Sequence, residues 1–213
     1  MVLKYTTWIF NLDGFVWNWR ELNPQFIKIF NHLKSEDKKI ILLSNNSAYS
    51  KAQYVKKLYE KGLEEIEEKN LFLSSDALIH HLHNNKIYKV YLIGEYGLLK
   101  DLEKEGIEIS KSSDHIVVGI DRTLTYEKLR QACVKIATKG ENEVYLYHLD
   151  NAVFWKIGEE LYPITLPVLS YLEECGKYTR IFVGKPSVIF KNALLSTYSI
   201  YPSTTIFVTN SIN

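Results

Sequence analysis

Residues 6–14 read TTWIFNLDG, a short run of β-branched and aromatic residues that ends in an Asp-Gly pair. Residues 39–47 read KIILLSNNS, another apolar run that ends in polar residues. Short apolar runs bounded by turn-forming residues predict buried strands. Between them, Asn23-Pro24 precedes apolar residues at helical spacing, and proline is favoured in the first turn of a helix. Two buried strands joined by a helix predict a parallel sheet with a crossover connection.

The same alternation continues along the rest of the chain. Further apolar runs predict strands at residues 90–93, 115–119, 144–147, 180–183 and 205–208. Helical spacing predicts further helices at residues 50–59, 98–104, 126–138, 166–174 and 188–198. Strands that alternate with helices predict the α/β class with a doubly wound, Rossmann-like parallel sheet. The middle of the chain holds enough elements for a second α/β domain.

Composition and charge narrow the classes of partner. The chain has 213 residues, 46% of them hydrophobic, which is enough for a sizeable core. The 26 basic and 25 acidic residues leave a net charge of +1, which favours neither nucleic acid nor an anionic membrane as a partner. No apolar run approaches the ~18 residues of a membrane span. Residues 1–10 are too short an apolar run for a signal peptide. We therefore expect a cytoplasmic protein.

Cysteine and histidine give no sign of a metal site. Cys133 and Cys175 lie far apart in segments with helical spacing, which predicts reduced, buried thiols. His80, His81 and His83 lie close together, but no cysteine or carboxylate cluster accompanies them. Because metal sites usually need such a cluster, these histidines predict the solvated end of a helix.

Four polar loops follow predicted strands, and ligands of parallel α/β sheets bind beyond the carboxyl ends of strands. The loops read Asn11-Leu12-Asp13-Gly14, Ser44-Asn45-Asn46-Ser47, Gly184-Lys185-Pro186-Ser187 and Thr209-Asn210-Ser211. In this order they resemble the four motifs of the haloacid dehalogenase superfamily. In its NagD-like, 4-nitrophenylphosphatase-like branch these motifs are DxDG, TNN or SNN, GKP and GD. Residues 94–98 (GEYGL) and 118–128 (VGIDRTLTYEK) also resemble the cap domain of that branch.

The resemblance implies a role for each loop in a Mg²⁺-dependent phosphatase. In that family the first Asp of DxDG attacks the phosphoryl group and binds Mg²⁺, and here Asn11 stands at that position. Asp13 matches the second Asp, which protonates the leaving group and binds the metal through its backbone carbonyl. Ser44 and Asn45 match the phosphate-binding loop, and Lys185 matches the lysine that balances the phosphate charge.

The resemblance also implies a domain division and two further site positions. A core of residues 1–72 and 162–213 would carry an inserted cap of residues 73–161. Within this cap, Asp121 and Arg122 match the part that faces the substrate, although a surface turn before the helix at residue 126 fits them nearly as well. Asn210 stands where the last metal-binding Asp belongs.

The departures from the family pattern predict a phosphatase relative that is catalytically silenced. A neutral carboxamide at Asn11 neither forms an acyl-phosphate nor offers anionic charge to Mg²⁺. Asn210 removes the second carboxylate, and the chain ends at Asn213, before a further acidic residue and a final helix and strand of the family. We therefore expect no cofactor, and a retained site for a phosphorylated small molecule or a protein partner.

Two alternatives remain open. The chain could be an active Mg²⁺-dependent hydrolase, either because Asn11 is a laboratory substitution made to trap substrate or because another carboxylate replaces it. It could also be a structural or interaction subunit. The elements expected beyond Asn213 would otherwise cover a sheet edge, and an exposed edge favours pairing with another copy in a homo-oligomer.

Overall fold

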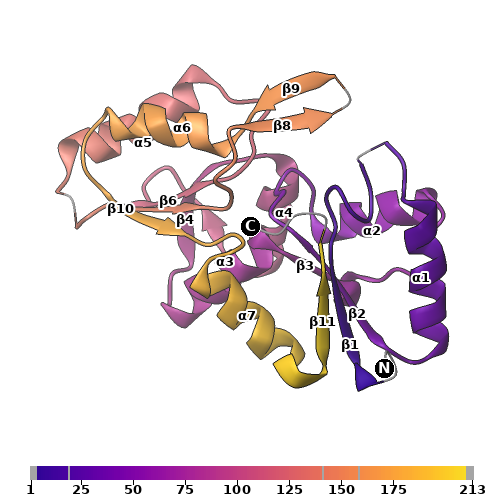
Figure 1. The fold of residues 1–213 in the computed structure, drawn as a ribbon. Coiled ribbons are helices and arrows are strands. Elements are labelled where there is room, and N and C mark those ends of the chain that lie inside the picture. The colour runs from indigo at the N-terminus through magenta and orange to yellow at the C-terminus, as the bar shows by residue number, and fades with distance from the viewer. Residues whose placement is uncertain (1–3, 19, 141, 158, 210–213) are drawn as a thin grey trace. The chain divides into compact units, whose positions relative to one another are not determined.

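The computed structural model describes residues 4–18, 20–140, 142–157 and 159–209, and the fold is drawn in Figure 1. The chain forms two compact units. The first unit holds Met1–Ser44, Lys51–Leu73 and Leu194–Asn213, and the second holds Asn45–Ser50 and Ser74–Ala193. Each unit is built around a parallel sheet, which confirms the α/β class predicted from the sequence.

The first unit contains a four-stranded parallel sheet in the order β11-β1-β2-β3. Its strands are β1 (Thr7–Asn11), β2 (Lys39–Ser44), β3 (Leu71–Leu73) and β11 (Thr205–Val208). Its helical segments are α1 (Pro24–Ser35), α2 (Lys51–Glu60), the short helices η2 (Glu68–Asn70) and η3 (Pro202–Thr204), and the end of α7 (Val188–Tyr198). The buried strand β2 leads from Lys39 to a fully buried Ser44.

Local sequence explains where α1 begins and ends. The Asn23 side chain accepts a hydrogen bond from the backbone N–H of Gln25 at 3.0 Å, and Pro24 occupies the first helical position. The helix buries one face, made of Phe26, Phe30 and Leu33. The spacing of these apolar residues is the feature from which the helix was predicted. The helix is followed by a turn in which Asp37 adopts a positive φ of 51°. That turn delivers the chain to β2.

The second unit contains a five-stranded parallel sheet in the order β10-β7-β6-β4-β5, and its cores lie on both faces of this sheet. The strands are β4 (Lys89–Ile93), β5 (Glu108–Ile109), β6 (His115–Val118), β7 (Tyr145–His148) and β10 (Thr179–Phe182). Helices α3 (Ser74–Asn84) and α4 (Tyr96–Lys104) pack on one face through residues such as Leu78 and Leu98. Helices α5 (Tyr126–Thr138) and α6 (Thr165–Glu173) pack on the other through Ile136 and Leu169. An antiparallel hairpin, β8 (Phe154–Ile157) and β9 (Glu160–Pro163), precedes α6.

The two units divide the chain differently from the core and cap predicted from the sequence. Residues 162–193, predicted to belong to the core, lie in the second unit. The reason is that β10 pairs with β7 along its whole length, while α6 covers the same sheet. Residues 45–50 also lie in the second unit, where the Ser47 hydroxyl accepts a hydrogen bond from the backbone N–H of Ile120 at 2.9 Å. The assignment of a core and an inserted cap stays a prediction.

The prediction of two reduced thiols was wrong. Cys133 on α5 and Cys175, just after α6, form a disulfide with their Cα atoms 5.3 Å apart. Both helices pack on the same face of the sheet, so residues separated by 42 positions in sequence become neighbours. Among the described residues, no helix combines the length and the apolar character needed to cross a membrane.

Candidate functional site

The first group of predicted site residues lies where β1 and β2 end. These strands are parallel neighbours, so Asn11 at the end of β1 and Ser44 at the end of β2 reach the same edge of the sheet. Gly14, with a φ of 83°, lets the following turn bring the Trp17 carbonyl back to the Gly14 N–H at 2.8 Å. The Asp13 carboxylate accepts hydrogen bonds from the Ser44 hydroxyl and, at 3.2 Å, from the Trp17 ring N–H. Asn11, Asp13 and Ser44 are therefore brought together as predicted.

The Asn11 side chain makes a contact that an aspartate at this position could not make. Its amide N–H donates to the backbone carbonyl of Asp13 at 2.7 Å. This carbonyl is the one that the family resemblance assigns to Mg²⁺. A hard cation prefers anionic oxygen ligands, but here a neutral amide faces the carbonyl, and the Asp13 carboxylate already accepts two hydrogen bonds. The described residues at this edge therefore do not fit a Mg²⁺ site.

The second group links Asn45 to Lys185, 140 positions later in the chain. The Asn45 carboxamide oxygen accepts from the Lys185 backbone N–H at 2.7 Å, and its amide N–H donates to the Lys185 backbone carbonyl at 3.0 Å. The Asn45 backbone carbonyl is itself fixed by the hydroxyl of Ser74 at 2.9 Å. Beyond Lys185, Ser187 caps α7 through its hydroxyl, which accepts from the Phe190 N–H at 3.1 Å. The Asn45–Lys185 pair thus holds the predicted GKP loop.

Replacing Asn45 should loosen this loop. In Asn45→Ala, the N–H and C=O of Lys185 both lose their partner, and unsatisfied groups of this kind cost about 1–3 kcal/mol. We expect the free energy of unfolding to fall by about 2 kcal/mol, measured by urea denaturation. The exposed Asn84, whose amide contacts the His80 ring on the same helix, provides the control. Asn84→Ala should change the stability by less than about 0.5 kcal/mol, and an equal loss in both variants would contradict the prediction.

Asp150 is a site residue that the sequence reasoning missed. It follows β7, and its carboxylate accepts hydrogen bonds from the backbone N–H groups of Asn151 at 2.7 Å and Ala152 at 3.0 Å. Burial raises its pKa, and the backbone hydrogen bonds together with Lys185 and the Asn45 side chain act in the opposite direction. The available signal was an acidic residue two positions after the end of a buried parallel strand. Asp150 places a carboxylate beside the Asn45–Lys185 pair.

His148, two residues earlier, is almost completely buried at the end of β7, with 1% of its surface exposed. Its Nε2 atom accepts a hydrogen bond from Arg180 Nε at 3.1 Å, and its Nδ1 atom lies 3.2 Å from the Asp150 backbone carbonyl. An acceptor at Nε2 requires the neutral ring with its proton on Nδ1. Burial accordingly lowers the pKa of His148 to about 4.

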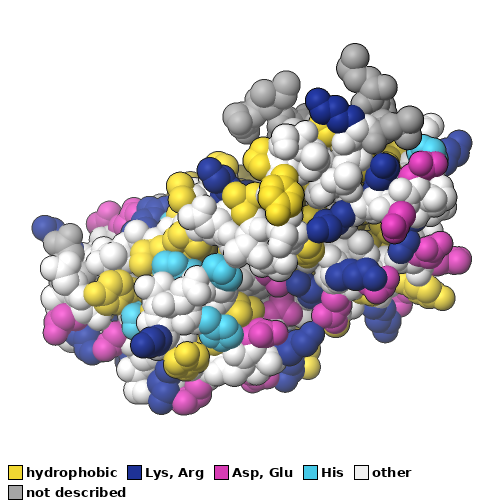
Figure 2. Space-filling model, turned by 90° about the horizontal axis from the view of Figure 1, so that it is seen from below, with side chains coloured by type: hydrophobic (Ala, Val, Ile, Leu, Met, Phe, Trp, Pro, Cys, Tyr) yellow, Lys and Arg dark blue, Asp and Glu magenta, His cyan; other side chains and the backbone are white. Residues whose placement is uncertain are grey.

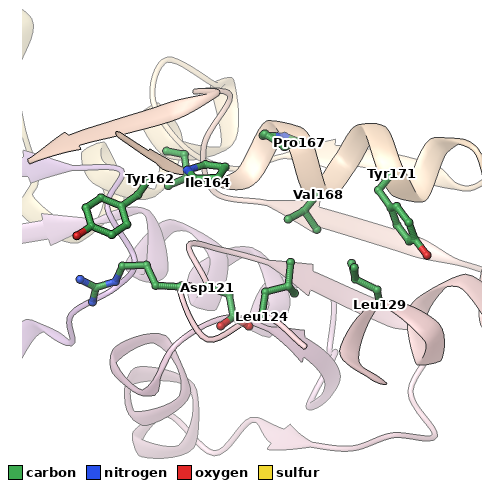
Figure 3. A pocket seen from close by; sticks show the side chains of 10 residues that line it. Asp121, Leu124, Leu129, Tyr162, Ile164, Pro167, Val168 and Tyr171 are labelled. Carbon is green, nitrogen blue, oxygen red and sulfur yellow. The ribbon is translucent and has the colours of Figure 1, made fainter. Parts of the chain in front are cut away.

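Asp121 and Arg122 line a pocket of about 440 Å³ in the second unit. Figure 3 shows Tyr162, Ile164, Pro167, Val168 and Tyr171 from β9, α6 and the turn between them on one side, with Asp121, Leu124 and Leu129 on the other. The Asp121 side chain is fully buried and accepts hydrogen bonds from Thr123 and from Lys128, the latter at 2.6 Å. These contacts give Asp121 a structural role at the start of α5. A contact with substrate stays a prediction.

Arg122 is already neutralised by Glu95, which the sequence analysis included in the cap-like motif at residues 94–98 but gave no site role. Two guanidinium nitrogens of Arg122 donate to the Glu95 carboxylate at 2.7 and 2.6 Å, and this pairing raises the pKa of Arg122. The guanidinium carbon also lies 5.3 Å from the centre of the Trp155 ring. Glu95 follows β4 as Asp150 follows β7, so the same strand-end signal applies. A ligand anion at Arg122 would have to compete with Glu95.

The remaining predicted positions are Asn210 and the three histidines. Asn210 lies outside the described residues. His80, His81 and His83 lie on α3, as predicted, and Figure 2 shows histidine side chains gathered on one face. The ring centres of His81 and His115 lie 5.7 and 5.9 Å from the centre of the Tyr147 ring. In the part of the chain that the structure describes, no group of three or more His, Cys, Asp or Glu residues could hold a metal ion.

Comparisons with known proteins found similar hydrolases. Residues 8–108 match the family model described as haloacid dehalogenase-like hydrolase. The chain is 30% identical to phosphoglycolate phosphatase 1A of Arabidopsis thaliana over 92% of its own length, and it spans 60% of that protein. It is 28% identical to the 5'-nucleotidase YutF of Bacillus subtilis (strain 168), with 89% of this chain and 73% of that protein covered.

Solved structures support the fold. The crystal structure of 4-nitrophenylphosphatase from Thermotoga maritima matches with a TM-score of 0.86 at 23% identity, over 97% of this chain and 79% of that one. The p-nitrophenyl phosphatase from Archaeoglobus fulgidus matches with a TM-score of 0.84 at 23% identity, over 94% and 77% of the two chains. Both similarities span the first and second units of this chain.

Proposed function

We propose that this chain, a member of the haloacid dehalogenase superfamily in its NagD-like, p-nitrophenylphosphatase-like branch, binds a phosphorylated small molecule. We also propose that it hydrolyses this ligand poorly or not at all. The observation that carries the proposal is the contact between the Asn11 amide N–H and the Asp13 carbonyl at 2.7 Å. An amide has no nucleophilic oxygen anion for attack on phosphorus. The Asn11 amide also donates a hydrogen bond to the backbone carbonyl that binds the metal in the family.

Phosphate binding is the part of the activity that we propose to be retained. Backbone N–H groups at the start of α7 and the ammonium of Lys185 suit an oxyanion, because a helix start and a cation both favour negative charge. The Asn45–Lys185 pair holds this loop before any ligand arrives. The expected ligand is a phosphate monoester of a small molecule, the class of substrate that the names of the relatives indicate.

The parent chain tests the proposal directly. We expect hydrolysis of p-nitrophenyl phosphate to be no faster with Mg²⁺ than with EDTA. Isothermal titration should at the same time detect phosphate or 2-phosphoglycolate binding that is lost in Lys185→Ala. Turnover at ordinary enzymatic rates, about 1–10³ per second, would overturn the silenced assignment.

A second candidate function is a working Mg²⁺-dependent phosphatase. The comparisons favour this candidate, because the curated relatives described above carry the names of phosphatases and a nucleotidase. It requires a carboxylate other than residue 11 to support the metal and the attack on phosphorus. In the same assay it would appear as Mg²⁺-dependent turnover by the parent chain that is abolished in Asp13→Asn.

A further inference from the structure

A basic cavity of about 480 Å³ lies in the first unit, away from the strand ends that carry Asn11 and Ser44. It opens at the opposite edge of the sheet, where β2 begins at Lys39 and where Asn70 directly precedes β3. Its walls come from the end of α1, the turn into β2, η2 and the end of α7. The lining residues are Lys34, Asp37, Lys38, Lys39, Ile40, Lys69, Asn70 and Tyr198.

The charge of this cavity is strongly one-sided, with four lysines against a single aspartate in the lining. Lys34 pairs with Glu65 at 3.5 Å and Lys69 with Glu67 at 2.9 Å, but these carboxylates are 69% and 53% exposed and neither lines the cavity. Ion pairs this exposed contribute at most about 1 kcal/mol. A bound anion can therefore replace them at little cost.

The other two lysines lie beside each other at the start of β2. Lys39 donates from its ammonium to the backbone carbonyl of Tyr198 at 2.8 Å, so its positive charge is not neutralised by a carboxylate there. The half-buried Lys38 donates its backbone N–H to the Leu33 carbonyl at 2.9 Å, and its side chain forms no ion pair with any described residue. Two unneutralised cations in a concave site attract anions more strongly than isolated surface lysines do.

The polar floor of the cavity is fixed before any ligand binds. Asn70, 6% exposed, donates to the Ile40 carbonyl at 3.0 Å and accepts from the Glu67 N–H at 3.0 Å. The Tyr198 hydroxyl donates to the Leu71 carbonyl at 2.9 Å, and its ring packs against Phe72. A preformed wall lowers the entropic cost of binding. The volume lies within the range of small-molecule sites, about 300–1,000 Å³.

We propose that this cavity, through Lys34, Lys38, Lys39 and Lys69, binds a compact diphosphate, either inorganic pyrophosphate or the diphosphate of a small organic molecule. The lysines stand on three separate segments around the cavity, so a ligand with two linked phosphoryl groups neutralises more of them than a single phosphate. The site is independent of the function proposed above, because it shares no residue with the loops at the other edge of the sheet.

The test measures binding of pyrophosphate, ADP and orthophosphate by isothermal titration at low salt without Mg²⁺. The double variant Lys38→Glu/Lys69→Glu reverses two charges of the cavity. The matched control Lys28→Glu/Lys111→Glu makes the same change of net charge at exposed lysines outside it. Circular dichroism and thermal unfolding establish that both variants are folded.

The parent chain should bind pyrophosphate or ADP at least tenfold more tightly than orthophosphate, and the tighter of the two identifies the source of the diphosphate. The cavity variant should lose at least tenfold in that affinity, whereas the control should stay within about threefold, as expected for long-range charge effects alone. Equal losses of affinity in both variants would show that the anion binds nonspecifically to basic surface residues and would overturn the proposal. Binding that disappears in Lys185→Gln but survives in the cavity variant would overturn it as well.

Discussion

The double variant Asn11→Asp/Asn210→Asp is expected to hydrolyse p-nitrophenyl phosphate in Mg²⁺ at least about 10³-fold faster than the parent chain, because loss of a catalytic nucleophile typically costs that much or more. The new carboxylate at position 11 would supply the attacking oxygen. It would also no longer donate a hydrogen bond to the Asp13 carbonyl, which the Asn11 amide contacts at 2.7 Å. The family resemblance assigns the last metal-binding Asp to position 210, so a carboxylate there is expected to add a second anionic ligand for the metal.

The single variants separate the two contributions. Asn11→Asp alone should gain part of the activity, since it supplies a carboxylate at the position that the family resemblance assigns to the nucleophile and to one metal ligand, whereas Asn210→Asp alone should stay at the level of the parent. Asn11→Ala removes the amide contact without adding a carboxylate, so it serves as the matched control. A double variant that binds Mg²⁺ without gaining turnover would show that a defect lies elsewhere in the site.

The stability of the chain should rise with pH between about 4 and 6.5 because of His148, whose pKa is lowered from 6.5 to about 4. In this window the unfolded chain binds a proton at position 148 and the folded chain does not, so acid favours unfolding. The stability that the neutral His148 contributes is therefore fully present above pH 6.5 and is lost as the pH falls toward 4. A shift of this size corresponds to about 3 kcal/mol.

Chemical denaturation across this pH range tests the effect against a non-titrating variant. His148→Gln keeps an acceptor for Arg180 and removes the titration, so its curve should be flatter than that of the parent. His81 and His115 also have lowered pKa values, caused mainly by burial, and they leave a residual slope in both proteins. Parallel curves for parent and His148→Gln would exclude His148 as the source.

The long apolar strands and the helices between them could be predicted from the sequence, because their burial imposes nearly continuous apolar runs. The elements that escaped prediction are short or exposed. Strands β3 and β5 contain three and two residues, too few for any periodicity. In the β8–β9 hairpin most side chains are exposed, so its pattern differs little from that of a loop.

The loops of the candidate site could be proposed from the sequence, but the contacts between their side chains could not. Strand ends identified Asn11, Asp13, Ser44, Asn45 and Lys185, because functional side chains of parallel sheets gather beyond the carboxyl ends of the strands. The amide contact of Asn11 and the pairing of Asn45 with Lys185 depend on side-chain orientation in the folded chain.

Three further features escaped prediction for a related reason. Asp150 and Glu95 obey the same strand-end rule, yet the side chains that they contact include partners distant in sequence. The Cys133–Cys175 disulfide depends on two helices sharing one face of a sheet, which periodicity alone does not specify. Each feature needs the tertiary arrangement before its chemistry becomes visible.

The two hydrogen bonds of the Asn45–Lys185 pair both go to main-chain atoms of residue 185. Asn45 can therefore bind the backbone of residue 185 whatever side chain that residue carries, as a neighbouring β-strand would. The backbone conformation of this loop and the charge at position 185 can therefore be varied separately. A library of residues at position 185 would vary the electrostatics of the loop on one constant backbone, so differences among its members would report the contribution of the cation itself.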